Sequence, residues 1–258
     1  MDFAALENWM EQLLPAVEAA GRAILDVRAK GFDVVTKADA SPVTAADQAA
    51  EHIVLEVVEK FSPVFPVVAE ERVAAGHMPT CGEAFWLVDA LDGTKEFIKG
   101  GSDFTVNVGF IQDGLPVMGL VHAPARHETY LGAISGGAHK AFVVRGGKRA
   151  AIAARPRPAK VVITGSKSHE VPELMDPFLA TLDVAEKVVI GSSLKFCLVA
   201  EGKADLYPRF GPTSEWDTAA GHAVLRAAGG RVHDFHGAEI RYNKPKFLNG
   251  VFLADGGA

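Results

Sequence analysis

The sequence predicts a layered α/β fold in which helices pack on mixed sheets. Two patterns carry the prediction: an antiparallel meander in the first half, and strands that alternate with helices in the second. A chain of 258 residues suits one large α/β domain, or two small ones that share a long core. The contents of 48% hydrophobic and 22% charged residues are ordinary for a soluble globular enzyme.

The first half begins with two helices. Over residues 3–29, apolar side chains recur at steps of three and four, which predicts an amphipathic helix. The run Thr44-Ala45-Ala46-Asp47 is typical of a capping box and opens a second helix that ends near Lys60. Short strands are expected at 33–37, 64–69 and 85–88. From Asp103 to Val144, alternating residues between turn signals predict the meander.

The second half follows a break at Arg155-Pro156-Arg157-Pro158, which is the best linker candidate. We therefore expect a first unit at 1–154 that carries the metal site and a second unit at 155–258 that carries substrate specificity. Strands are expected at 161–164 and 187–190, and helices at 191–200 and 218–228.

The charge balance limits the partners of the protein. A formal net charge of −6 argues against DNA or RNA, because binding to a phosphate backbone needs a basic face. An acidic protein that handles phosphates needs another source of positive charge, and metal ions provide one. We therefore expect a small phosphorylated metabolite as partner. The oligomeric state is left open between a monomer and a homodimer.

The cysteine count and the apolar runs bear on location. Two cysteines make no disulfide framework of the secreted type, which favours free thiols in a reducing compartment. No run of about eighteen apolar residues exists, so no transmembrane helix is expected. The first residues lack the basic region of a signal peptide. We expect a cytoplasmic protein, and peripheral attachment to the inner membrane is left open.

Acidic side chains stand at the ends of several predicted elements and are candidate Mg²⁺ ligands. One follows a strand, two flank a turn that Gly93 closes, and one opens a helix. Mg²⁺ takes hard oxygen ligands, and carboxylates three residues apart on a turn fixed by a strand can aim at one point. The candidate ligands are Glu70, Asp89, Leu91 through its carbonyl, Asp92 and Asp217.

Each of these features also has a simpler structural explanation. The run Asp89 to Thr94 can be a polar turn, since Asp and Gly favour turns for backbone reasons. Glu70 can be a solvated strand end, and Asp217 can be the N-cap of the following helix. Asp47 can be no more than the acid of the capping box. The combination of four acidic sites and a hydroxyl at element ends favours the functional interpretation.

The run Val88-Asp89-Ala90-Leu91-Asp92-Gly93-Thr94 resembles the first signature of the inositol monophosphatase superfamily. Glu215-Trp216-Asp217-Thr218-Ala219-Ala220-Gly221 resembles the second. The similarity extends from the first helix to about Gly230. It implies a layered αβαβα sandwich of the inositol monophosphatase and sugar phosphatase type.

Within the superfamily the chain is most similar to the bacterial 3′(2′),5′-bisphosphate nucleotidases. The stretches that carry this likeness are 41–44, 92–98, 104–107, 192–197 and 204–209. One departure is visible, because the family usually has proline where this chain has Ala90. Proline would fix φ and stiffen the turn, so we expect a looser loop that keeps its ligands.

The resemblance implies roles for the acidic residues. One Mg²⁺ would be held by Glu70, Asp89 and the Leu91 carbonyl, and a second by Asp89, Asp92 and Asp217. The family also has room for a third, weakly held ion near Glu70. Two divalent ions about 4 Å apart can clamp an in-line phosphoryl displacement.

The resemblance also implies how water would be activated. Thr94 would relay the proton of the attacking water to Asp47, so these two residues are the expected catalytic pair. The backbone N–H groups of Gly93 and Thr94 would cradle the phosphate.

Substrate choice is expected to depend on two segments of the second half. In the nucleotidases, a serine and a histidine in the segment that holds Ser166 and His169 lie near the nucleotide. The segment around Ser193 and Lys195 opens a helix and suits a second phosphate. Structural alternatives remain, namely a polar loop for the first segment and an ordinary Ser cap with solvated Lys195 for the second. The expected substrate-binding residues are Glu70, Leu91, Asp92, Gly93, Thr94, Ser166, His169, Ser193, Lys195 and Asp217.

A second anion site favours adenosine 3′,5′-bisphosphate, hydrolysed to AMP and phosphate, as the substrate. Such an enzyme would clear a by-product of sulfate activation. An inositol monophosphatase or related sugar-phosphate phosphatase, a broad phosphatase, and a catalytically silent sensor of a phosphorylated metabolite are the alternatives. Inhibition by Li⁺ is expected for either leading enzyme and does not separate them.

Overall fold

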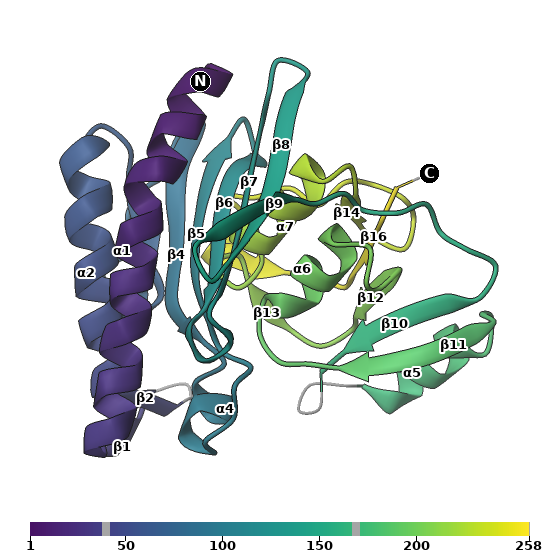
Figure 1. The fold of residues 1–258 in the computed structure, drawn as a ribbon, viewed down its shortest axis with the longest axis horizontal. Coiled ribbons are helices and arrows are strands. Elements are labelled where there is room, and N and C mark those ends of the chain that lie inside the picture. The colour runs from purple at the N-terminus through teal and green to yellow at the C-terminus, as the bar shows by residue number, and fades with distance from the viewer. Residues whose placement is uncertain (38–41, 167–170, 258) are drawn as a thin grey trace.

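The computed structural model describes residues 1–37, 42–166 and 171–257, and every structural statement refers to these ranges. Within them, layers of helices and sheets alternate through the molecule (Figure 1). Two long helices cover one face of a seven-stranded sheet, and two shorter helices lie between that sheet and a five-stranded one. A further helix covers the outer face of the second sheet. The layered αβαβα sandwich expected from the sequence is confirmed.

The first layer consists of α1 (Phe3–Lys30) and α2 (Ala45–Phe61). Both agree with the predicted ranges to within one residue, because each has a clear apolar face that is buried against the sheet. The Asp2 carboxylate caps α1 by accepting from the N–H of Ala5 at 2.8 Å. The capping box at the start of α2 is present as expected.

The seven-stranded sheet runs in chain order, and only its first two strands are parallel. It confirms the predicted meander. The first strand is shorter than expected, because a turn at Ser62 to Phe65 follows α2. The strands are β3 (Val67–Ala69), β4 (Ala84–Asp92), β5 (Thr105–Gln112), β6 (Leu115–Ala123), β7 (Glu128–Ser135), β8 (Ala138–Arg145) and β9 (Lys148–Ala151).

The five-stranded sheet has the order β11-β10-β12-β16-β14. Its first two pairs are parallel and its last two antiparallel. Phe178 and Leu179 of α5 (Pro172–Leu179) pack on its outer face. The strands are β10 (Val161–Gly165), β11 (Val184–Val189), β12 (Leu206–Arg209), β14 (Arg231–His233) and β16 (Phe252–Asp255).

Several short elements were not expected from the sequence, because a piece of two to five residues leaves almost no periodic signal. They include one strand of one small antiparallel pair, both strands of another, and four helical turns. The strand expected at 33–37 is present as β1 (Val34–Thr36), and it pairs with the unexpected β2 (Pro42–Thr44). The remaining unexpected elements are β13 (Thr213–Ser214) with β15 (Leu248–Asn249), α3 (Glu70–Ala74), α4 (Thr94–Ile98), η1 (Pro124–Arg126) and η2 (Pro245–Phe247).

The middle layer holds α6 (Leu194–Ala200) and α7 (Ala219–Ala227), as expected. Helix α7 lies directly on the backbone of three strands, because each strand has a glycine below it. A Cβ added at Gly119 would stand 2.3 Å from the carbonyl oxygen of Ala220. The nearest atom of α7 would stand 2.8 Å from a Cβ added at Gly109 and 2.7 Å from one added at Gly132. These glycines therefore set the depth of α7 on the sheet.

The predicted linker lies in a stretch, 152–158, without helix or strand. The two halves nevertheless share a core, because α7 of the second half covers the sheet of the first. Arg145 on β8 also donates to Glu201 at the end of α6, at 2.8 Å. The boundary between 154 and 155 stays a prediction.

The cysteines are both free, as expected, with Cys197 buried and Cys81 partly exposed. Burial raises the pKa of the Cys81 thiol to about 11, which makes it unreactive near neutral pH. None of the described helices is both long and apolar enough to cross a bilayer.

We predict that Gly119→Ala lowers the free energy of unfolding by about 1–3 kcal/mol, since the methyl group has no space below α7. Urea denaturation of both proteins measures the difference. Gly82→Ala is the matched control, because no atom lies within 4 Å of the added Cβ. Equal losses in the two variants would contradict the close packing of α7.

The carboxylate of Asp255 on β16 generates a second prediction. Burial opposes its charge, but hydrogen bonds from Arg231 and His233 outweigh burial and lower its pKa below the usual value. A lowered pKa contributes stability at neutral pH that is lost as pH falls below about 4. Asp255→Asn should therefore be less stable than the parent at pH 7, and the gap should narrow below pH 4 in chemical denaturation. A gap that stays constant down to pH 3 would contradict this assignment.

Candidate active site

The run from Asp89 to Asp92, which was expected to form a turn after a strand, is instead the irregular end of β4. Asp89 pairs with Asn107 of β5 and Asp92 with Thr105, so β4 has one extra residue in between. The expectation that the strand ends at Asp89 is wrong, because pairing resumes at Asp92. The N–H of Leu91 donates to the Asp89 carboxylate at 2.9 Å and closes the bulge.

Gly93 connects this bulge to α4. Its φ of 94° lies in the left-handed region, which favours glycine. A Cβ there would also stand 2.9 Å from the backbone oxygen of Asp103. Both the positive φ and the lack of space for a Cβ therefore require glycine at this position.

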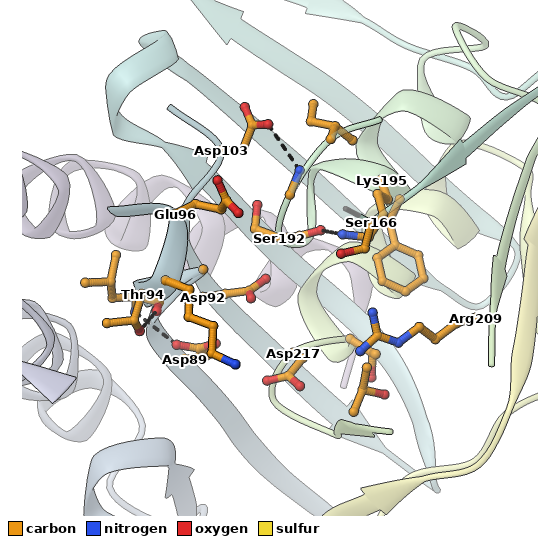
Figure 2. A pocket seen from close by; sticks show the side chains of 18 of the residues that line it. Asp89, Asp92, Thr94, Glu96, Asp103, Ser166, Ser192, Lys195, Arg209 and Asp217 are labelled. Atoms are coloured by element: carbon orange, nitrogen blue, oxygen red, sulfur yellow. Dashed lines mark hydrogen bonds between the residues drawn. The ribbon is translucent and has the colours of Figure 1, made fainter. Parts of the chain in front are cut away.

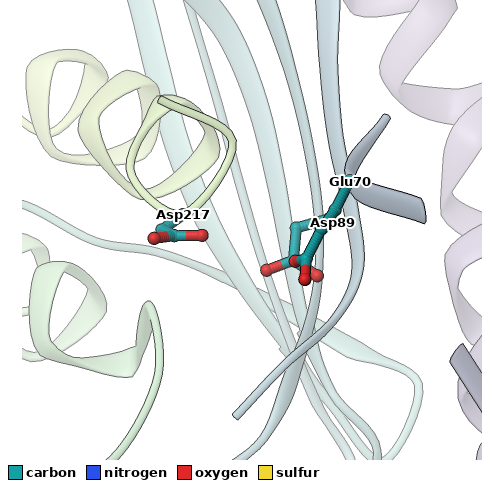
Figure 3. A group of neighbouring side chains, drawn as sticks. All are labelled: Glu70, Asp89 and Asp217. Atoms are coloured by element: carbon teal, nitrogen blue, oxygen red, sulfur yellow. The ribbon is translucent and has the colours of Figure 1, made fainter. Parts of the chain in front are cut away.

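Three of the predicted ligands meet at one point. Glu70 opens α3, Asp89 lies in β4, and Asp217 stands two residues before α7. Each offers a carboxylate oxygen, and these oxygens all lie within 4.8 Å of one another. Figure 3 shows Asp217 facing the other two carboxylates across the site.

The electrostatics of these carboxylates are unfavourable without a cation. Burial raises the pKa of Asp89 well above its usual value, and the charges of Glu70, Asp92 and Asp217 raise it further. Burial and the charges of Asp92 and Glu70 also raise the pKa of Asp217 well above its usual value. Like charges at such separations repel strongly in a partly buried site. Binding of a cation would therefore stabilise the cluster.

Two of the simpler structural explanations are wrong. Thr218, not Asp217, occupies the N-cap position of α7, and the Asp217 carboxylate accepts from the N–H of Ser214 at 2.8 Å. Glu70 is not a solvated strand end, because it pairs with Lys37 at 2.7 Å. Asp47 does form the capping box with Thr44, but its carboxylate also makes a second contact.

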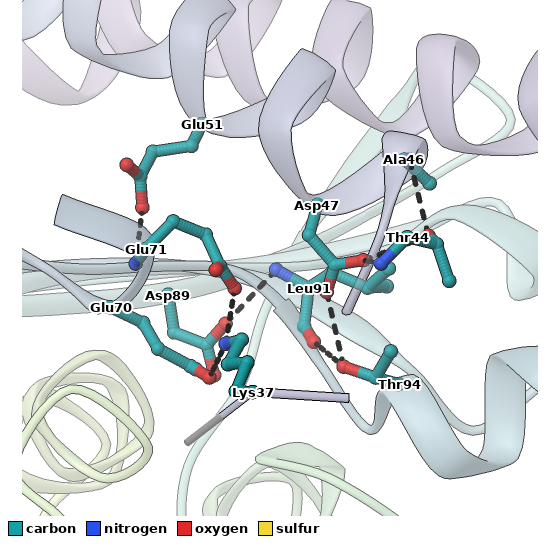
Figure 4. A network of polar contacts seen from close by, with 10 residues as sticks. All are labelled: Lys37, Thr44, Ala46, Asp47, Glu51, Glu70, Glu71, Asp89, Leu91 and Thr94. Carbon is teal, nitrogen blue, oxygen red and sulfur yellow. Dashed lines mark hydrogen bonds and ion pairs between the residues drawn. The ribbon is translucent and has the colours of Figure 1, made fainter. Parts of the chain in front are cut away.

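That second contact is with Thr94, the other expected catalytic residue. The Thr94 hydroxyl lies 3.1 Å from both the Asp47 carboxylate and the Leu91 carbonyl (Figure 4). It has one proton and two acceptors, so it can switch its donor bond between them. Burial raises the pKa of Asp47, although bonds from Thr44 oppose the shift. A raised pKa makes this carboxylate a stronger proton acceptor.

Lys37 was not expected at the site. Its ammonium contacts Glu70 at 2.7 Å and Glu71 at 2.5 Å, and its side chain is only 8% exposed (Figure 4). Burial alone would lower its pKa, but the charge of Glu70 and the hydrogen bonds raise it overall. Its contact with Glu70 joins positions 33 residues apart, so no local pattern could reveal it.

The cluster lies in a cavity of about 270 Å³, and Figure 2 shows the side chains that line it. Most predicted site residues line this cavity: Glu70, Asp89, Leu91, Asp92, Gly93, Thr94, Ser166, Lys195 and Asp217. Asp47 and Ser193 are not among the lining residues. His169 lies outside the described residues.

The far side of the cavity from Asp89 and Thr94 is basic (Figure 2). Lys195 is only 4% exposed, so the alternative that it is solvated is wrong. Its ammonium donates to the Ser192 carbonyl at 2.6 Å and stands over the ring of Tyr207. Burial lowers its pKa to about 8, although Asp92 opposes the shift. It therefore still carries positive charge at neutral pH.

Arg209 and Ser192 line the same wall and were missed by sequence reasoning. Arg209 is 8% exposed, and carbonyls of Gly211 and Pro212 hold its guanidinium. Ser192 has a positive φ of 53°, which is rare for serine. Its buried hydroxyl has no partner among the described residues. Such strain and an unpaired group often mark functional sites.

The donor set fits a hard divalent cation. The converging atoms are carboxylate oxygens, and Leu91 lines the same cavity. Oxygen-only donors suit Mg²⁺ and Ca²⁺, whereas Zn²⁺ sites are usually built with His or Cys. Asp92 lines the cavity beside this group, and burial raises its pKa while Lys195 opposes the shift.

The fold and this acidic cavity define the class of protein. Residues 5–255 match the model of the inositol monophosphatase family, and the chain belongs to that family. The resemblance seen in the two signature runs is thereby confirmed.

Particular relatives are similar along nearly the whole chain. A protein of Escherichia coli O157:H7 named 3′(2′),5′-bisphosphate nucleotidase CysQ is 47% identical over 94% of this chain and 98% of its own. The relative of that name from Buchnera aphidicola is 36% identical. The crystal structure of CysQ from Bacteroides thetaiotaomicron has a TM-score of 0.78 and 35% identity, over 96% of this chain and 97% of that one. An IMPase from Thermotoga maritima, at 24% identity and a TM-score of 0.78, shares the fold.

Proposed function

We propose that this protein is a Mg²⁺-dependent 3′(2′),5′-bisphosphate nucleotidase that hydrolyses adenosine 3′,5′-bisphosphate to AMP and phosphate. The observation that carries the proposal is a single cavity with an acidic wall and an opposite basic wall. The acidic wall suits metal ions and the phosphoryl group that reacts. The basic wall suits a second phosphate that does not react. The CysQ relatives, whose printed names state this activity, support the same assignment.

We assign one Mg²⁺ to Glu70, Asp89 and the Leu91 carbonyl and a second to Asp89, Asp92 and Asp217. When bound, such a pair neutralises charge on the phosphoryl oxygens and lowers the pKa of an attacking water. The convergence of three of these carboxylates within 4.8 Å supports the assignment. A third ion near Glu70 stays a prediction.

The residues of the chain move the protons. Thr94 accepts a proton from the attacking water and passes its own to Asp47, at 3.1 Å. As the water oxygen bonds to phosphorus, the bond from phosphorus to the ribose oxygen breaks, and that oxygen takes up a proton from a solvent water molecule. The N–H groups of Gly93 and Thr94, which line the cavity, would orient the phosphoryl group.

The basic wall would recognise the 5′-phosphate. Lys195 and Arg209 are buried cations that line the cavity, so a phosphate there would bind in a site of reduced dielectric. Ser192 and Ser166, which also line it, supply polar contacts. A role for His169 stays a prediction.

The metabolic role of this activity follows from its substrate. An enzyme that removes adenosine 3′,5′-bisphosphate would recycle a by-product of sulfate activation. We propose the cytoplasm as its location, and we do not propose attachment to the inner membrane. The choice between a monomer and a homodimer stays a prediction.

Metal dependence is the first test. Asp89→Asn should lower kcat for adenosine 3′,5′-bisphosphate by about 100-fold or more, because one carboxylate serves both cations. Excess EDTA should abolish phosphate release by the parent protein, and Mg²⁺ should restore it. The matched control, Asp26→Asn, changes an exposed carboxylate on α1 and should leave kcat unchanged. Phosphate release that persists in EDTA would refute the metal mechanism.

Substrate choice is the second test. A phosphate-release panel of adenosine 3′,5′-bisphosphate, AMP, inositol 1-phosphate and fructose 1,6-bisphosphate should give the highest kcat/KM for the first. A higher value for inositol 1-phosphate would favour the alternative phosphatase. Binding of the bisphosphate without turnover would favour the sensor.

The basic wall is tested by Lys195→Gln. This change should raise KM for the bisphosphate by about tenfold, because one charge-assisted bond to phosphate is lost. The effect on inositol 1-phosphate should be smaller. Lys160→Gln, at an exposed position, is the control. Equal changes for both substrates would contradict a separate site for the second phosphate.

A further inference from the structure

A buried polar bridge joins the end of β4, which carries Asp92, to the loop that carries Asp217. Asn107 on β5 is fully buried, and its amide nitrogen donates to the Ser193 hydroxyl at 3.0 Å. The same nitrogen lies 3.4 Å from the Asp92 carboxylate. The Ser193 hydroxyl in turn donates to the Asp217 carbonyl at 2.6 Å. The bridge is thus a continuous chain between two predicted ligands of one cation.

The donor directions in this chain are determined by its ends. A carbonyl oxygen only accepts, so in the 2.6 Å contact the proton of the Ser193 hydroxyl points to Asp217, although the Asp92 carboxylate also accepts from Ser193. The Ser193 oxygen must then accept from Asn107, and the amide nitrogen faces it. An ionised Asp92 also only accepts, so it favours the same orientation of the amide. Reversing the amide would place its oxygen against two acceptors.

The amide is not explained by packing alone. Asn107 is fully buried on β5, and a fully buried strand position usually holds an apolar side chain. The Asn107 oxygen has no partner among the described residues, which disfavours a buried amide. Neither Asn107 nor Ser193 lines the cavity. Their polar atoms therefore act on the site through Asp92 and Asp217.

We propose that Asn107 and Ser193 are positioning residues that set the separation of Asp92 and Asp217, and so the affinity for the cation between them. This inference rests on the proposed function, and it reassigns Ser193, which the sequence placed among the substrate-binding residues. Partners that orient metal ligands typically change metal affinity about 10- to 100-fold when they are removed.

Binding of Mn²⁺ to the whole protein, followed by electron paramagnetic resonance and calorimetry, tests the inference. In the parent we expect two classes of site. Asn107→Ala and Ser193→Ala should each weaken one class by about 10-fold or more and leave the other unchanged. Because both residues belong to one chain, the double variant should be weakened by less than the product of the two single effects.

Two further variants separate positioning from general destabilisation. Thr129→Ala removes a buried hydroxyl from β7, where it contacts His122, and should leave both classes of Mn²⁺ site unchanged. Ser193→Thr keeps the hydroxyl and should bind Mn²⁺ more tightly than Ser193→Ala. Ser193→Ala removes a single oxygen atom, so it keeps the inference testable if Asn107→Ala does not fold.

The outcomes distinguish this inference from the proposed function. If the parent binds two Mn²⁺ and Ser193→Ala binds both equally well, the bridge has no positioning role and the proposed function stands. If both classes weaken together, the assignment to one cation is wrong. If the parent binds no Mn²⁺, the proposed metal site fails, and this inference fails with it.

Discussion

Mutual repulsion among the carboxylates of Glu70, Asp89 and Asp217 is the constraint on which the rest of the site depends. These groups come from α3, β4 and the loop before α7, and the fold holds their oxygens within 4.8 Å of one another. Two unit charges about 5 Å apart repel by on the order of 3 kcal/mol at the dielectric typical of such sites. Tertiary packing must outweigh this repulsion until a cation relieves it.

Two lysines with little-exposed side chains share this task. Lys37 pairs with Glu70 at one edge of the cluster, and Lys195 opposes the raised pKa of Asp92 at the other. Their arrangement leaves the centre of the cavity negative and its far wall positive. A ligand with one phosphate at each end matches this field, whereas a ligand with one phosphate uses only half of it.

Sequence reasoning succeeded where the signal was local or carried by a known motif. The helix at 3–29 and the meander follow from apolar periodicity, and two members of the acidic cluster, Asp89 and Asp217, belong to the two signature runs. It missed the β4 bulge, because the bulge is defined by pairing with Asn107 and Thr105 of β5, which no pattern within β4 reveals. It missed Lys37, because the contacts of that residue join distant segments.

The glycines below α7 have a consequence for how mutational data on this protein would be interpreted. Asp217 precedes α7 by two residues, so the height of that helix above β5, β6 and β7 also sets how far its carboxylate stands from Asp89. A screen scored on growth would record Gly109, Gly119 and Gly132 as intolerant positions, on a par with metal ligands. None of them lines the cavity. Their intolerance would reflect the distance between α7 and the sheet, not contact with a ligand. A rescue screen should therefore find compensating changes on the surface of α7 rather than in the site.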